Sequence, residues 1–144
     1  MEQFDNFEEI NNFEITKNQS KNYNSLVFAY IGDAVFSLFV RSYFASKSNS
    51  KAGILNTKVN KFVRASSQSK AFLFLEDKLT EEELRISKSA RNIKTNNVAK
   101  NSNLEEYKRA TMFEALLGYL YMINSKERLN QILDMSVKFM EENV

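Results

Sequence analysis

SLVFAYIGDAVFSLFVRSYF, residues 25–44, is the most apolar segment of the chain and decides its fold. Apolar side chains fall on every side of a helical wheel drawn for this segment, which is typical of a central, buried helix. The densest apolar run, Leu26 to Val40, is 15 residues long and carries Asp33 near its middle. A membrane-spanning helix needs about 20 mostly uncharged residues, so we expect the core helix of a globular domain and no membrane partner.

A second segment of the same kind, residues 105–123, is also apolar nearly all round and predicts a second buried helix. Between the two, residues 54–75 predict one amphipathic helix, because apolar side chains recur on one face at spacings of three and four. The members of this face are Leu55, Val59, Phe62, Val63, Ser66 and Leu73.

Capping patterns indicate two further helices. Thr80 and Glu83 form a capping box that predicts a helix over residues 81–91. Ser125 is a candidate N-cap of a final amphipathic helix. The buried face of that helix would consist of Leu129, Ile132, Leu133, Ser136, Val137 and Met140. Residues 92–103 are rich in Asn and Lys and predict a loop or a short polar helix.

Glycine and proline usage favours an all-α fold. The 144 residues include three glycines and no proline, so most of the residues that form hairpin turns and break helices are missing. A chain of this length fits one domain. The acidic residues 1–20 predict a peripheral arm, which leaves residues 21–144 for the domain. The N-terminus lacks the basic start and apolar run of a secretory signal, which predicts a cytoplasmic location.

Composition limits the chemistry and indicates a polyanionic partner. Cysteine and histidine are absent, which excludes thiolate nucleophiles, histidine bases and Cys/His zinc sites. The net charge of +2 is unevenly distributed: residues 41–100 carry 13 Lys or Arg against five acids. This basic middle third suits a nucleic acid. The alternative is a solvated lysine-rich surface.

One carboxylate lies in each of the two most apolar segments: Asp33 in YIGDAVF and Glu114 in TMFEALLGYL. An ionised carboxylate in apolar surroundings is costly unless it is paired or bound to a metal. If the two helices pack together, Asp33 and Glu114 could share a hard cation such as Mg²⁺. The alternatives are that each acid pairs with a lysine or arginine from another helix, or lies at a solvent-exposed edge.

Basic side chains form two candidate nucleic-acid contacts. The first is a polar stripe on the predicted helix 54–75, at spacings of three, three and four residues. It consists of Lys58, Lys61, Arg64 and Gln68. The second is the segment that contains Lys88, Arg91, Asn92 and Lys94. Either could contact a phosphate backbone, and the alternative for each is a solvated helix face.

The two apolar segments that contain Asp33 and Glu114 resemble the motifs of the ribonuclease III family. AYIGDAVFSLFVR, residues 29–41, is similar to the family's signature, a glycine-aspartate-small-valine run after two large apolar residues. ATMFEALLGYLY, residues 110–121, resembles its second acidic motif. Between them, VRASSQSKAF and SKSARNIK are similar to segments of the Mini-ribonuclease III subgroup. The resemblance spans residues 21–144 and implies a ribonuclease III-like catalytic domain without a double-stranded-RNA-binding domain.

Three positions depart from the larger members of that family, which carry further acids before each motif residue. Those positions are Leu26, Ala29 and Thr111 here. The departures match the Mini-ribonuclease III subgroup, which retains one acid per motif. By resemblance, Asp33 and Glu114 are therefore the catalytic and metal-binding residues.

The resemblance also implies the activity and its partners. It implies a homodimer formed through the signature helices and a cytoplasmic endoribonuclease that cuts double-stranded RNA, not DNA. The implied cofactor is Mg²⁺, with Mn²⁺ as a substitute, and the implied substrate is precursor 23S ribosomal RNA. We expect the duplex to be recognised by shape, through phosphates and 2′-hydroxyls, with 5′-phosphate products.

Two other functions remain open from the residues alone. One is a non-catalytic double-stranded-RNA-binding protein of the same fold. The other is a helical scaffold protein, in which Asp33 and Glu114 would have no joint role and would lie far apart.

Overall fold

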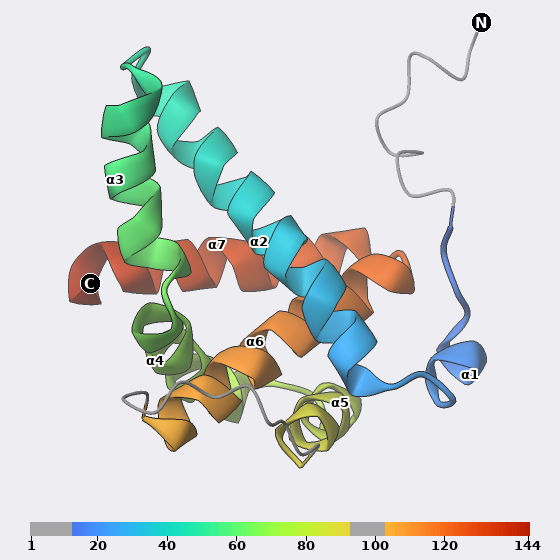
Figure 1. The fold of residues 1–144 in the computed structure, drawn as a ribbon. Helices are drawn as coiled ribbons and strands as arrows, with labels where there is room; N and C mark the ends of the chain where they lie inside the picture. Colours follow the sequence, from blue (N-terminus) through green and yellow to red (C-terminus); the bar gives the residue numbers. More distant parts are fainter. Residues whose placement is uncertain (1–12, 93–102) are drawn as a thin grey trace, which may run out of the picture.

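The structure, a computed structural model, describes residues 13–92 and 103–144, and within these ranges it is helical without strands (Figure 1). The helices are α1 (Lys17–Ser20), α2 (Ser25–Lys47), α3 (Ala52–Val63), α4 (Ala65–Leu75), α5 (Glu81–Arg91), α6 (Leu104–Met122) and α7 (Lys126–Asn143). A short 3-10 turn, Glu76–Lys78, follows α4. The predicted all-α fold class is confirmed.

Helices α2 and α6 cross at the centre of the molecule, and two glycines let their backbones touch (Figure 1). A Cβ atom added to Gly32 would lie 1.7 Å from the carbonyl oxygen of Glu114. A Cβ atom added to Gly118 would lie 1.7 Å from the carbonyl oxygen of Phe28. Only a residue without a side chain allows this approach. The crossing therefore fixes which residues of α2 face which residues of α6.

The other helices surround this crossing. Helices α4 and α5 pack against α6, α7 contacts α4 and α6, and α3 lies against α2 as the second arm of a hairpin (Figure 1). Near the two glycines in the sequence of their helices, Phe36 of α2 and Phe113 of α6 are fully buried, and their rings meet edge to face with centroids 5.0 Å apart. Such burial of large apolar side chains is the main stabilising contribution to a domain of this kind.

The predicted helices with local capping or spacing signals are confirmed. Helix α6 covers the predicted second buried segment, and α7 buries the six predicted side chains. Helix α5 begins with the predicted capping box: Glu83 N donates to Thr80 Oγ1 and Thr80 N donates to Glu83 Oε1, at 3.1 and 2.9 Å. Ser125 occupies the N-cap of α7, although its side chain makes no capping hydrogen bond.

The prediction of one helix over residues 54–75 is wrong, because Arg64 has an extended backbone (φ −69°, ψ 155°) that separates α3 from α4. Two side chains of α4 bond to carbonyls at the end of α3 and stabilise the break. Ser67 Oγ donates to the carbonyl of Lys61, and Gln68 Nε2 donates to that of Val63 at 3.2 Å. Side chains that bond to nearby backbone groups compete with a continuous helix.

The break also changes which side of residues 65–75 faces the core. Leu73, predicted to be buried, is 51% exposed, whereas Gln68, predicted to lie on the polar stripe, is only 2% exposed. The buried positions of α4 are instead Ser67, Gln68, Ser69, Ala71, Phe72 and Leu75.

Helix α2 is buried on one face only, which corrects the prediction that it is buried on every side. Phe28, Phe36 and Val40 are fully buried against the rest of the domain. On the opposite face Tyr30 and Leu38 are 79% and 68% exposed. By length and composition alone α2 would also pass for a membrane span, a property shared by core helices of globular domains. The helix thus presents an apolar face that this single chain does not cover.

Residues 13–20, which we assigned to a peripheral arm, contact the domain in part. Ile15 is buried, and its backbone N donates to the carbonyl of Met122 at 2.8 Å. Residues 1–12 and most of the predicted loop, residues 93–102, lie outside the described ranges.

Candidate functional site

The two acids predicted from the sequence meet at the glycine crossing. Asp33 follows Gly32 on α2, and Glu114 is the residue whose carbonyl Gly32 contacts on α6. The Asp33 carboxylate lies near enough to Glu114 for its charge to raise the pKa of the Glu114 carboxyl group. Asp33 is exposed and Glu114 is half-buried, so the pair lies at the surface end of a buried helix contact. The expectation for a helical scaffold, that these acids lie far apart, is wrong.

No basic side chain of the described residues neutralises this pair. The ion pairs found within residues 13–92 and 103–144 join Lys78 to Asp77, Arg109 to Glu105 and Arg128 to Glu83. The alternative in which a lysine or arginine from another helix pairs with Asp33 or Glu114 is therefore not observed there. Asp33 does face solvent, as the second alternative expected, but it does so beside another carboxyl group.

The two acids fit a hard cation with few protein ligands. Neighbouring carboxylates without a basic partner repel each other, and a divalent cation between them would remove that repulsion. Within the described residues no third acid completes a cluster. Ala29 is buried, and the Thr111 hydroxyl donates to the carbonyl of Tyr107 at 3.0 Å. Mg²⁺ accepts one or two carboxylates and keeps several waters, so Asp33 and Glu114 would hold it.

Burial and the charge of Asp33 raise the pKa of the Glu114 carboxyl to about 8, and the interaction with Gln68 opposes this rise in part. The cause is that both effects disfavour the ionised form. Without a cation, Glu114 is therefore largely protonated at neutral pH.

This pKa has a consequence for stability that the Glu114→Gln variant would reveal. The pKa of Glu114 is higher in the folded chain than its value of 4.5 in the unfolded chain. The stability that protonated Glu114 contributes to the folded state is therefore fully present below pH 4.5 and is lost as the pH rises towards 8. Metal-free Glu114→Gln should thus melt at least about 3 °C above the wild type at pH 8.5, with a smaller difference at pH 5.

Thermal unfolding in EDTA at several pH values measures this difference. The control is Glu141→Gln, which changes an exposed carboxyl on α7. A melting difference between Glu114→Gln and the wild type that does not grow with pH would contradict the raised pKa.

Gln68 is buried, so it does not lie on the exposed basic stripe where we predicted it. The sequence did contain a signal for this burial, because Gln68, Ala71, Phe72 and Leu75 follow one another at helical spacings and share one face. This signal was missed because we predicted one continuous helix over residues 54–75.

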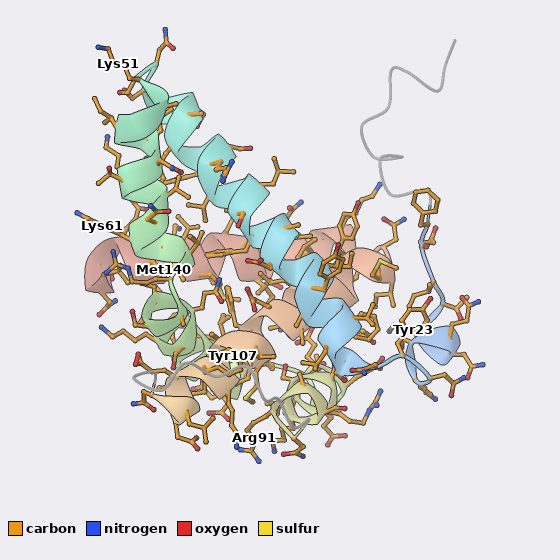
Figure 2. All side chains as sticks on the ribbon, in the orientation of Figure 1. Tyr23, Lys51, Lys61, Arg91, Tyr107 and Met140 are labelled. Atoms are coloured by element: carbon orange, nitrogen blue, oxygen red, sulfur yellow. The ribbon has the colours of Figure 1, made fainter. Side chains whose placement is uncertain are left out.

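The other predicted nucleic-acid contacts are exposed but do not form one patch. Lys58 and Lys61 lie on α3, and Arg64 lies at the break, where its Nε donates to the carbonyl of Asn60 at 3.3 Å. Lys88, Arg91 and Asn92 are exposed at the end of α5. Figure 2 shows Lys61 and Arg91 well apart. Lys94 lies outside the described residues.

Comparisons with known proteins agree on one family. Residues 26–125 match the model of the ribonuclease III domain. The chain is 41% identical over 131 residues to a Mini-ribonuclease 3 of Clostridium tetani, covering 90% of this chain and 87% of that one. It is 35% identical over 127 residues to a Mini-ribonuclease 3 of Staphylococcus aureus, covering 87% and 95%.

A solved structure has the same fold. The crystal structure of a protein from Fusobacterium nucleatum is similar with a TM-score of 0.74 and 32% identity, covering 81% of this chain and 93% of that one.

Proposed function

Because this chain belongs to the ribonuclease III family and to its Mini-ribonuclease III subgroup, we propose that it matures precursor 23S ribosomal RNA in the bacterial cytoplasm, in a magnesium-dependent reaction. The family membership makes the chain an endoribonuclease that acts on double-stranded RNA. The observation that supports the magnesium dependence is the pairing of Asp33 with Glu114, without a basic partner among the described residues.

Asp33 and Glu114 would hold the cation, and Mn²⁺ would be accepted as a substitute because it also prefers oxygen ligands. When bound, such an ion supplies a nucleophile derived from water and stabilises the charge on the leaving oxygen. The residues of the chain contribute their position and charge. The glycine crossing brings Asp33 beside Glu114, and a bound cation would favour the ionised form of both carboxyl groups. The usual products of this family carry 5′ phosphates.

Cleavage of a long duplex RNA by the purified protein tests the activity. We expect cuts in the presence of Mg²⁺ or Mn²⁺, none in EDTA, and none in duplex DNA of the same sequence. A duplex segment taken from precursor 23S ribosomal RNA should be cut at discrete positions. Binding without cleavage at every Mg²⁺ concentration would instead support the non-catalytic RNA-binding alternative.

The exposed basic side chains of α3 and the α3–α4 break are the proposed grip on RNA. Each phosphate contact releases condensed counterions, so losing contacts weakens binding and reduces its dependence on salt. We expect Lys58→Ala/Lys61→Ala/Arg64→Ala to lower duplex affinity by at least about tenfold at low salt, nearly equally for all duplex sequences. Filter-binding titrations at several salt concentrations measure both effects.

The matched control is Lys17→Ala/Lys21→Ala/Lys138→Ala, which removes the same charge from exposed positions on or next to α1 and α7. If both triple variants bind alike, the α3 side chains are only a solvated surface. Lys88, Arg91 and Asn92 remain proposed as a second contact on α5.

The exposed apolar face of α2, with Tyr30 and Leu38, is the proposed homodimer interface. Two sites related by a two-fold axis match the symmetry of the two strands of a duplex. We expect sedimentation at micromolar concentration to give twice the 16.7 kDa chain mass, and Tyr30→Glu/Leu38→Glu to sediment as a monomer. A wild type that sediments only as a monomer would contradict this proposal.

A further inference from the structure

Tyr107 lies on the face of α6 that carries Glu114. The two residues are seven positions apart, close to two helical turns, so their side chains point the same way, about 10 Å apart along the helix axis. Both of them, and Thr111 between them, are half-buried and form one strip along α6. In the view of Figure 2, Tyr107 lies between Lys61 of α3 and Arg91 of α5, which belong to the two proposed contacts with RNA.

The neighbouring helices α4 and α5 bond to other sides of α6. Arg109 faces α4, because its Nε donates to Ser69 Oγ at 2.9 Å. Two residues turn a helix by about 200°, so Tyr107 points almost the opposite way from Arg109. On another side, the hydroxyl of Tyr119 donates to Glu82 of α5, and Tyr119 lies about a third of a turn around the helix from Tyr107. These bonds place α4 and α5 on other sides of α6 than Tyr107.

The phenol of Tyr107 is a free hydrogen-bond donor on this strip. Among the residues that the structure describes, none bonds to its hydroxyl. The Thr111 hydroxyl instead donates to the carbonyl of Tyr107 at 3.0 Å. A phenol is uncharged and both donates and accepts, which is also the character of a ribose 2′-hydroxyl. Phosphates are better matched by cations, so the neutral phenol suits a 2′-hydroxyl.

We propose that the Tyr107 hydroxyl binds a ribose 2′-hydroxyl close to the scissile phosphate and so contributes to the selection of RNA over DNA. Duplex RNA displays its 2′-hydroxyls in a wide, shallow minor groove, and a duplex that contacts both α3 and α5 would pass over Tyr107. DNA has no group at this position for the phenol to bind. This inference rests on the proposed site at Asp33 and Glu114, and it gives Tyr107 no part in the reacting atoms.

The variant Tyr107→Phe tests this contact, because it removes only the hydroxyl group. Its matched control is Tyr23→Phe, since Tyr23 is 40% exposed, stacks on Phe28 and lies outside the proposed RNA contacts. Filter binding in EDTA measures the affinity for duplex RNA without cleavage. Cleavage of a short duplex with one mapped cut, in Mg²⁺, measures kcat/KM. The same duplex is then prepared with a single 2′-deoxyribose, moved one position at a time on both sides of the cut.

We expect Tyr107→Phe to lower the affinity and kcat/KM for the all-RNA duplex by about three- to tenfold, the usual effect of one neutral hydrogen bond. Its melting temperature should not change. In the wild type, a deoxyribose at one position should cause a loss of similar size. At that position the deoxyribose should cause no further loss in Tyr107→Phe, because both changes remove the same bond. Tyr23→Phe should bind and cleave like the wild type.

Several results would overturn the contact and leave the proposed function intact. They are wild-type affinity and kcat/KM in Tyr107→Phe, an equal loss in Tyr23→Phe, and losses that add at every ribose position. A scan in which no ribose position affects the wild type would also overturn it, and this measurement needs no variant. A wild type that neither binds nor cleaves the all-RNA duplex would overturn both the contact and the proposed function.

Discussion

Asp33→Asn and Glu114→Gln are each expected to abolish cleavage of duplex RNA, with a loss of at least about 10³-fold, which corresponds to several kcal/mol of transition-state stabilisation. Each change replaces a carboxylate by a neutral amide of nearly the same shape. An amide is a poorer ligand for a hard cation, so the site loses the charge that holds it. Cleavage of a long duplex over a range of Mg²⁺ concentrations measures the loss.

Both variants should remain folded and bind RNA. Neither acid packs in the core: Asp33 is exposed and Glu114 is half-buried. Replacing either carboxyl group by an amide also removes the electrostatic cost of ionising both groups at once. The control is Asp134→Asn, an exposed acid on α7, which should cleave like the wild type. Full activity of Asp33→Asn or Glu114→Gln at saturating Mg²⁺ would refute the assignment of the site.

Gly32→Ala and Gly118→Ala are expected to be the most destabilising small substitutions in the described part of the chain. In each variant the new methyl group would lie 1.7 Å from a backbone oxygen of the facing helix. A backbone atom cannot turn away as a side chain can, so α2 and α6 have to separate. We expect each variant to lose at least about 3 kcal/mol of unfolding free energy, because such overpacking exceeds that of ordinary core substitutions.

Gly53→Ala is the matched control for this prediction. Gly53 is also helical, but a Cβ atom added there meets no atom within 4 Å. Alanine is a better helix former than glycine, so this variant should be up to about 1 kcal/mol more stable than the wild type. Urea denaturation compares the three variants. If Gly32→Ala unfolds at the same urea concentration as Gly53→Ala, the helices do not touch at this point.

The sequence predicted best where the signals are local. The capping box of Thr80 and Glu83 and the spacing from Leu129 to Met140 located α5 and α7, because these patterns depend on residues within one or two turns. It predicted less well where distant residues decide. The break between α3 and α4 occurs at Arg64, which is neither a proline nor a glycine. It depends instead on side chains of the next helix, which bond to carbonyls at the end of α3.

In the candidate site, too, the features with a local sequence signal were predicted and those that depend on distant residues were not. Asp33 and Glu114 were identifiable as acids in apolar segments, but their contact depends on two glycines that are 86 positions apart, Gly32 and Gly118. The burial of Gln68 could not be predicted while residues 54–75 were taken as one helix. The composition of α2 alone could not predict its open face either, because an apolar face covered by its own chain and one left open have the same composition.

The contact between Gly32 and Gly118 also means that a related protein could lose its nuclease activity and keep its fold. Gly32 and Asp33 are consecutive residues, yet the fold depends on the first and the proposed nuclease activity on the second. A lineage released from its nuclease role would lose Asp33 or Glu114 without harm to the fold, while Gly32 and Gly118 would still be required. Retained glycines beside a lost acid would therefore mark a relative that still folds without the proposed nuclease site.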